Sequence, residues 1–167
     1  MKKMTEQFLQ EAFAGESQAH MKYNIFSEVA EKEGMPNVAR MFKAIAYAEQ
    51  VHATNHFREL GMIRSTTENL GEAMGGEDFE VDEMYPAYKE VAKMQGEKGA
   101  VKTTNYALEA EKIHSKMYHK AQESAEAGND IELKTVYICP VCGYTHEGDP
   151  PDYCPVCGAA KEKVNSF

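Results

Sequence analysis

Two copies of the pattern Glu-x-x-His are the residues in this chain best suited to do chemistry. They are Glu49 to His52 and Glu111 to His114. On a helix, positions i and i+3 project from the same face, so each copy offers a carboxylate oxygen and an imidazole nitrogen to one point in space. Two such helices facing each other can hold a pair of metal ions. The two copies therefore predict a dinuclear metal site.

Three further glutamates complete the expected ligand set. A carboxylate on the apolar stripe of a helix is costly unless it is paired or bound to a cation. Glu16 falls on such a stripe, and Glu80 and Glu83 are i and i+3 neighbours near the start of another expected helix. A single such glutamate is usually exposed, but the duplicated motif makes a shared site the better interpretation. The predicted dinuclear ligands are Glu16, Glu49, His52, Glu80, Glu83, Glu111 and His114.

The first three quarters of the chain contain an internal duplication. One constant offset in residue number matches Tyr23 with Tyr85, Gly34 with Gly96, Glu49 with Glu111 and His52 with His114. Each half is therefore expected to supply half of the metal site. The same offset places Glu16 on Asp78 rather than on Glu80, so Asp78 is a lesser candidate. We expect Glu77 and Asp82 to be solvated.

The remaining histidines and two tyrosines have simpler interpretations. We expect His20, His56 and His119 to be solvated or hydrogen-bonded rather than metal ligands. Tyr23 and Tyr88 are expected to pack in the core, with a hydrogen bond from the phenol to a ligand carboxylate as the sharper alternative.

A second metal site is predicted by four cysteines near the end of the chain. They are Cys139, Cys142, Cys154 and Cys157, in two Cys-Pro-Val-Cys-Gly knuckles. Four thiolates from two knuckles form a tetrahedral site for one ion. Spacing alone does not separate iron from a structural zinc ion. A neighbouring dinuclear site favours iron, because iron carries electrons and zinc does not.

The periodicity predicts a mainly α protein with two domains. Helices are expected over 6–33, 36–60, 78–95 and 100–127, with 61–79 as a crossing connection that includes a short helical turn. Pro86 predicts either a kink or a helix that starts near that residue. The domains are expected to be 1–130, a four-helix bundle, and 131–167, a small β and loop module around the cysteines. A module this short has little core of its own, so its metal is expected to stabilise its fold.

Composition excludes several classes of function. The formal net charge is −9, with 43% hydrophobic and 27% charged residues. An acidic surface argues against a nucleic-acid partner. No signal peptide and no apolar run of membrane-spanning length is expected, and four cysteines in metal-binding pairs favour a reducing, cytoplasmic location.

Six segments together resemble the rubrerythrin family over nearly the whole chain. They are Phe13–Glu16, Ala48–His52, Phe79–Pro86, Ala110–His114 and the two cysteine knuckles. The resemblance implies a ferritin-like di-iron bundle followed by a rubredoxin-like domain. It implies a cytoplasmic peroxidase that reduces hydrogen peroxide to water, with two irons in the carboxylate site and one iron in the tetracysteine site.

The resemblance also implies roles and partners. Glu49 and Glu111 would bridge the irons, Glu16 would be terminal on one iron, and Glu80 with His114 would bind the other. On reduction, one iron would exchange a carboxylate ligand for a histidine, which here means Glu83 for His52. The resemblance further implies a homodimer whose electrons pass between subunits, fed by NAD(P)H through a reductase and a free rubredoxin. We add the hypothesis that the long connection permits helix exchange between the subunits.

Two other functions fit the same residues. A ferritin-like ferroxidase would oxidise ferrous iron with oxygen or peroxide and would need neither a reductant nor the cysteine module. A zinc-ribbon interaction protein with a vestigial bundle would be colourless and would show no turnover. Metal content and reductant-driven peroxide consumption separate the three.

Overall fold

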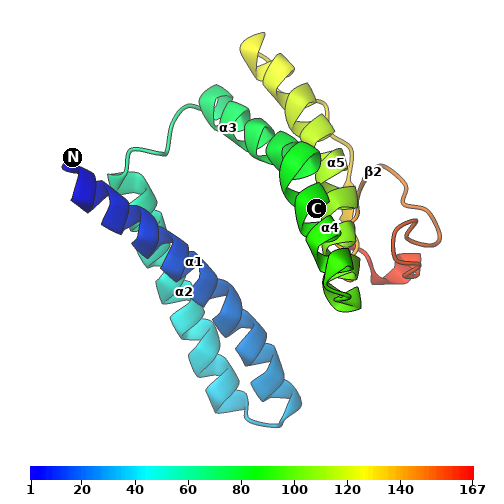
Figure 1. The fold of residues 1–167 in the computed structure, drawn as a ribbon, viewed down its shortest axis with the longest axis horizontal. Coiled ribbons are helices and arrows are strands. Elements are labelled where there is room, and N and C mark those ends of the chain that lie inside the picture. Colours follow the sequence, from blue (N-terminus) through cyan, green and yellow to red (C-terminus); the bar gives the residue numbers. More distant parts are fainter. The chain divides into compact units, whose positions relative to one another are not determined.

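The computed structural model describes all residues, 1–167, as two compact units, Met1–Arg64 and Ser65–Phe167. Four long helical segments are followed by three short strands (Figure 1). The predicted mainly α fold class with a small strand-and-loop module is confirmed. No helix combines the length and the apolar character that a bilayer crossing requires.

The first unit is a helical hairpin of α1 (Lys3–Lys32) and α2 (Pro36–Glu59). Gly34 ends α1 with a positive φ of 76°, a conformation that glycine adopts without steric penalty. The N–H of Gly34 donates to Glu31 O, and the N–H of Met35 donates to Ala30 O. This is a Schellman turn, and Pro36 then starts α2 where a missing N–H costs nothing.

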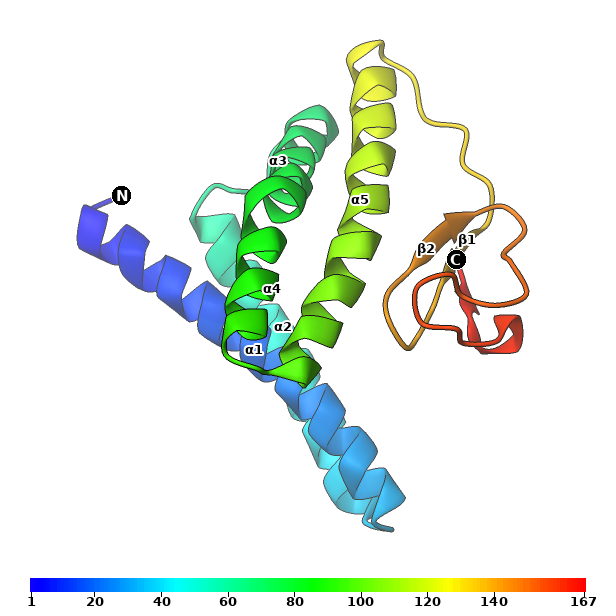
Figure 2. The same ribbon diagram turned by 45° about the vertical axis from the view of Figure 1, so that its right-hand side comes forward.

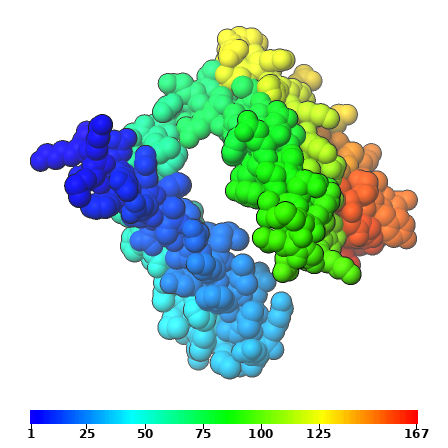
Figure 3. All heavy atoms as spheres, viewed as in Figure 1, coloured from blue at the N-terminus to red at the C-terminus, as the bar shows by residue number.

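Small side chains allow α1 and α2 to approach closely. Ala30, Ala39, Ala46 and Ala53 are all buried, and the buried Ser27 hydroxyl donates to Ala39 O across the hairpin at 2.9 Å. The spheres of the two helices, blue to cyan, lie against each other along the hairpin (Figure 3). Alanine contacts set the helix spacing, and polar side chains can then reach across it.

The second unit contains the other hairpin. Its first arm is α3 (Thr66–Phe79), a π-helical segment η1 (Glu80–Met84) and α4 (Tyr85–Met94), and its second arm is α5 (Lys98–Glu126). The turn repeats the first hairpin: the N–H of Gly96 donates to Lys93 O, and the N–H of Glu97 donates to Ala92 O. Equivalent hydrogen bonds at equivalent positions of the two halves are what an internal duplication predicts.

The expectation that 61–79 is mainly a connection is wrong. Helix α3 occupies most of that stretch, and the true connection is confined to the few residues before Thr66. The helix begins with a capping box, in which the Ser65 hydroxyl accepts from the Glu68 N–H and the Glu68 carboxylate accepts from the Ser65 N–H. This cap offsets the low helix propensity of the three glycines that follow.

Pro86 affects the backbone before it, as expected. In a regular α-helix its ring would clash with the carbonyl of Asp82. The five residues Glu80–Met84 are instead π-helical, and the N–H of Tyr85 donates to Glu80 O, five residues earlier. The wider turn provides the space that proline needs, and α4 begins directly afterwards.

The cysteine module forms a three-stranded antiparallel sheet in the order β2-β1-β3. The strands are β1 (Val136–Ile138), β2 (Thr145–Glu147) and β3 (Asn165–Ser166), with a 3-10 turn η2 (Lys161–Lys163) before the last. In the register between β1 and β2, Ile138 pairs with Thr145.

The module packs against α5 within the second unit (Figure 2). A Cβ at Gly143 would lie 3.9 Å from the Ala110 Cβ, so the first knuckle touches the helix. Lys120 Nζ lies 3.7 Å from Glu147 Oε2 at the other end of β2. The predicted domain boundary at residue 130 therefore remains a proposal, since residues 131–167 share a compact unit with α3 to α5.

Candidate metal centres

The first unit gathers one cluster of predicted ligands. Glu16 on α1 and Glu49 and His52 on α2 have ligand atoms within 4.8 Å of one another. His52 Nδ1 lies 3.0 Å from Glu49 Oε2 and 3.9 Å from Glu16 Oε1. The His52 side chain is 54% exposed, whereas the Glu49 side chain is 16% exposed. Two carboxylates and an imidazole thus converge at the hairpin surface.

The second unit repeats this arrangement with one substitution. Its cluster is Glu77 on α3 with Glu111 and His114 on α5. His114 Nδ1 lies 2.6 Å from Glu111 Oε2 and 3.9 Å from Glu77 Oε2. The distances match those of the first cluster, and Glu77 occupies the place that Glu16 has there.

The expectation that Glu77 is solvated is wrong. Its side chain is only 20% exposed, and its Oε2 atom is buried without a hydrogen-bond donor. The sequence carries a signal for this residue, because Glu77, Glu80 and Glu83 follow one another at i, i+3 spacing. Glu77 is therefore the site residue that the motif analysis missed.

Electrostatics in the second cluster reflect crowded carboxylates. Burial and then the neighbouring carboxylate of Glu111 raise the pKa of Glu77 to about 7. Burial, then the charge of Glu111, also raises the pKa of Glu80. A cation bound here would relieve both the repulsion and the desolvation.

The other acidic candidates are placed differently. Glu80 and Glu83 both lie on the π-helical segment, where Glu80 is half-buried and Glu83 is exposed, and neither belongs to the second cluster. Asp78 accepts from the Ser115 hydroxyl at 2.6 Å and lies 3.0 Å from His119 Nε2, so it ties α3 to α5. Asp82 is exposed, as predicted.

The remaining histidines and tyrosines have ordinary partners. His20 Nδ1 lies 2.8 Å from Ala46 O, which joins α1 to α2. Tyr23 packs against aromatic rings of its own hairpin, and Tyr88 is exposed. The tyrosine whose phenol is affected by the carboxylates is Tyr85. Its pKa is raised by burial and then by the negative charges of Glu80 and Glu111. Position 85 matches Tyr23 in the duplication, which is the signal that could have found it.

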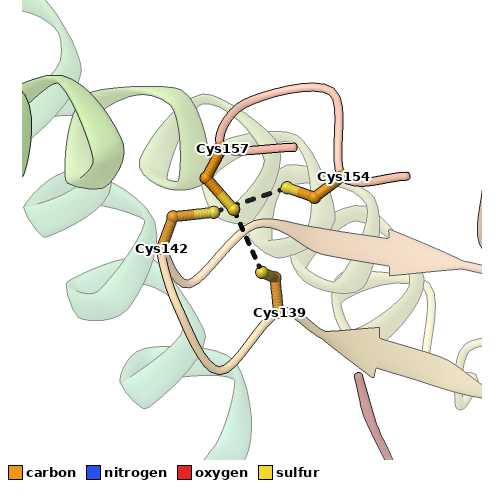
Figure 4. Close-up of side chains that lie close together, drawn as sticks. All are labelled: Cys139, Cys142, Cys154 and Cys157. Atoms are coloured by element: carbon orange, nitrogen blue, oxygen red, sulfur yellow. Dashed lines mark hydrogen bonds between the residues drawn. The ribbon is translucent and has the colours of Figure 1, made fainter. Parts of the chain in front are cut away.

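The four cysteines converge as predicted (Figure 4). Cys139 Sγ lies 3.6 Å from Cys157 Sγ, and Cys142 Sγ lies 3.5 Å from Cys154 Sγ. These separations exceed the disulfide bond length of about 2 Å. They approach the distance of about 3.8 Å that a tetrahedral ion with bonds of about 2.3 Å imposes on its sulfurs. The residues therefore fit a single tetrahedral ion.

Backbone amides favour the thiolate at one of the four cysteines. Burial, together with hydrogen bonds to the neighbouring thiols, raises the pKa of Cys142, and burial raises that of Cys157. At Cys154 burial acts in the same direction, but hydrogen bonds from the N–H groups of Cys157 and Val156 outweigh it and lower the pKa to about 7. Donors aimed at sulfur favour the charged form, which is the form that binds a metal.

The fold and the two kinds of donor define a class of protein. Carboxylate and imidazole clusters on a duplicated helical hairpin are the donor set of a non-haem di-iron carboxylate protein. The buried, unpartnered Oε2 of Glu77 is an oxygen that only a cation or a proton would satisfy. The tetracysteine module adds a one-ion site of rubredoxin type.

Comparison with known families agrees with this class. The family model described as Rubrerythrin matches residues 7–122, and the model described as the rubrerythrin rubredoxin-like domain matches residues 137–164. The chain belongs to the rubrerythrin family.

Relatives cover the whole chain. Rubrerythrin-2 of Clostridium acetobutylicum is 47% identical over 98% of this chain and 97% of its own length. Nigerythrin of Nitratidesulfovibrio vulgaris is 32% identical over 95% of this chain and 84% of its own length. Solved structures of nigerythrin in mixed-valent and fully reduced, all-ferrous states are 30% identical, with TM-scores of 0.56 and 0.57, and cover 98% of this chain and 86% of theirs.

Family membership fixes the cofactors and the broad role. The chain carries a di-iron carboxylate site and an iron site held by four cysteines. It is an oxidoreductase of oxidative-stress defence, in a family whose members work with iron and redox partners.

Proposed function

We propose that this protein is a non-haem di-iron peroxidase that reduces hydrogen peroxide to water. The reaction consumes one peroxide, two electrons and two protons and yields two waters. When bound, the two irons supply one electron each, so that the O–O bond is cleaved without release of a hydroxyl radical. The observation that carries the proposal is the direct contact between the tetracysteine module and His114 of the carboxylate cluster within one unit. A redox module placed on a ligand of the oxidising site is what a peroxidase needs and what a ferroxidase does not.

We assign the iron ligands to both hairpins. The first hairpin would supply Glu16, Glu49 and His52, and the second would supply Glu80, Glu83, Glu111 and His114. Their burial supports bridging roles for Glu49 and Glu111, because each side chain is 16% exposed, less than Glu16 and Glu77 in the same clusters. Glu16 would be terminal on one iron, with Glu80 and His114 on the other. Glu77 is a further ligand candidate, because it lies within the second cluster.

The exchange of Glu83 for His52 remains part of the proposal. Both side chains are exposed in their own units, so either can move without breaking core contacts. His114, by contrast, has a partner on each ring nitrogen. One mobile and one fixed histidine are what a site with a single exchanging ligand requires.

External electrons are proposed to come from NAD(P)H through a reductase and a free rubredoxin, and the protein is proposed to act as a homodimer in the cytoplasm. A reducing compartment keeps the four cysteines available as thiolates rather than disulfides.

One experiment tests the peroxidase proposal. The purified protein is analysed for iron and zinc, and peroxide consumption is followed with NADH, a reductase and rubredoxin. We expect one NADH to be consumed for each peroxide, because both are two-electron reagents. The paired variant Cys139→Ser with Cys157→Ser is expected to retain the helical units and lose NADH-driven turnover.

Two results would contradict the proposal. A full iron complement without peroxide reduction would exclude peroxidase activity. Oxidation of added ferrous iron at the same rate in the wild type and in the cysteine variant, with no demand for NADH, would establish the ferroxidase alternative.

A further inference from the structure

Thr145 occupies an unusual position at the start of β2. It is one of two buried polar residues in the chain, with only 3% of its surface exposed. Its Oγ1 has two partners: the carbonyl of Gly143 at 3.1 Å and the Nε2 of His114 at 2.7 Å. The same hydroxyl therefore contacts both the first cysteine knuckle and a residue of the carboxylate cluster.

The donors and acceptors of this contact orient the ring of His114. A threonine hydroxyl has one proton to donate and lone pairs with which to accept. The Gly143 carbonyl can only accept, so all three groups are satisfied together when the hydroxyl donates to Gly143 O and accepts from an Nε2–H of His114. Nδ1 is the ring nitrogen on the opposite side, 2.6 Å from Glu111 Oε2 and 3.9 Å from Glu77 Oε2. Nδ1 is therefore the ring nitrogen that faces the carboxylate cluster and any metal held there.

The surroundings of this hydrogen bond are mostly apolar on one side. An open pocket of about 370 Å³ lies beside it, with Leu70, Tyr118 and Ile138 among the residues of its wall. These walls offer few polar groups that compete for the contact, and the module supplies the hydroxyl that orients the ring.

The first hairpin lacks this device. His52 Nδ1 lies 3.0 Å from Glu49, as in the second cluster, but within residues 1–64 its Nε2 has no protein partner. The two histidines are equivalent in the duplication, and within their own units only His114 has a hydrogen-bond partner on Nε2.

We propose that Thr145 is a positioning residue that holds the His114 ring with Nδ1 toward the carboxylate cluster and connects the ring through hydrogen bonds to the Cys142–Gly143 knuckle. The inference rests on the proposed function only for its effect on turnover. The ring orientation itself is a property of this chain. The connection runs from Cys142 through the Gly143 carbonyl and the Thr145 hydroxyl to the imidazole, entirely within one unit.

Two substitutions test the role of the hydroxyl. Thr145→Val removes it and keeps the side-chain shape, and Thr145→Ser retains it. Thr135→Val on the exposed side of the module is the matched control for the same chemical change. The tetracysteine iron is left in place in all four proteins, and its visible absorption verifies that the module is folded.

The first readout is independent of activity. With Zn(II) in the carboxylate site, we expect a protected Nε2–H signal of His114 in nitrogen-resolved NMR of the wild type and of Thr145→Ser, and its loss in Thr145→Val. In a cobalt(II) titration of the same site, we expect Thr145→Val to bind the metal about 10–100-fold more weakly than the wild type. Thr145→Ser and Thr135→Val should bind it within about threefold of the wild type. Retention of the signal and of the affinity in Thr145→Val would overturn the proposal, as would failure of Thr145→Ser to restore them.

The second readout separates this inference from the peroxidase proposal. If the wild type reduces peroxide, Thr145→Val is expected to re-oxidise its reduced tetracysteine iron at least about tenfold more slowly after mixing with peroxide, with an unchanged KM for peroxide. An unchanged rate would refute the coupling role. If the wild type does not reduce peroxide but the NMR and cobalt results hold, the peroxidase proposal fails while the positioning of His114 stands.

Discussion

Replacing Glu77 by glutamine should change the stability of the protein in opposite directions with and without metal. In the metal-free fold, the pKa of Glu77 is raised from 4.5 to about 7 by burial and by Glu111. The folded state then binds more protons than the unfolded state between these values, so its stability falls as the pH rises through that window. Glutamine removes the charge and should abolish this loss.

The magnitude follows from the two pKa values. Each pH unit corresponds to about 1.4 kcal/mol, so ionisation of a fully shielded Glu77 would cost about 3 kcal/mol. One fifth of the side chain is exposed, and solvent screening reduces the cost to about 1–2 kcal/mol. Glu77→Gln should therefore raise the Tm of the metal-free protein at pH 8 by roughly 2–8 °C, and by much less at pH 5.

The effect of Glu77→Gln on stability changes sign when metal is present. A carboxylate ligand that becomes an amide should weaken binding at least about tenfold, which removes about 1.4 kcal/mol of metal-induced stabilisation. The assay is thermal unfolding of wild type and variant at pH 5 and pH 8, with chelator and then with excess cobalt(II). Glu72→Gln, an exposed glutamate on the same helix, is the control and should show neither effect.

Two results would refute this reasoning. A lower Tm of metal-free Glu77→Gln at pH 8 would mean that Glu77 is not destabilised by its neighbours. An equal cobalt-induced rise in both proteins would mean that Glu77 does not bind the metal, and Glu80 alone would then keep its proposed place.

Three other predictions concern exchange, pH and assembly. Glu83→Ala should lower peroxide turnover at least about tenfold while changing Tm by no more than about 2 °C, since the side chain is exposed; equal turnover would refute its exchange with His52. The pKa of Glu147 is lowered by the Lys134 N–H and then by Lys120, so its stabilisation is present above pH 4.5 and lost as the pH falls through its folded pKa. The Tm difference between wild type and Glu147→Gln should accordingly be largest near neutrality and vanish in acid, and a constant difference would exclude this cause. If the hairpins are exchanged in a dimer, co-expressed Glu49→Ala and Glu111→Ala chains should form one intact site per mixed dimer and recover activity that each variant alone lacks; no recovery would exclude exchange.

The features that can be predicted from sequence are those whose partners are local. Both Glu-x-x-His pairs have the i, i+3 geometry that their spacing predicts, and the cysteine knuckles converge, because short loops and helices fix these distances. The helix over Thr66–Phe79 escapes prediction because its three glycines suggest a loop, although the Ser65 and Glu68 capping box marks its start.

The features that cannot be predicted depend on packing between distant segments. Thr145 contacts His114 only because β2 lies on α5, and no spacing in the sequence encodes a contact between residues so far apart in the chain. Glu77 is expected in solvent because the constant offset between the two halves matches Glu16 with Asp78. The structure instead uses Asp78 to hold Ser115 and His119 and turns Glu77 inward.

The π-helical segment explains that one-residue discrepancy and records how the two halves diverged. Seven positions separate Glu16 from Tyr23, whereas eight separate their structural counterparts Glu77 and Tyr85. A single residue added to an α-helix is commonly absorbed as one wide turn, and the only such turn in this chain, Glu80–Met84, falls within that interval. One inserted residue rotates the helix before it by about 100° relative to the helix after it. The two hairpins thus differ by one residue over this interval, and Glu77, Glu80 and Glu83 lie at and just before the wide turn that accommodates it.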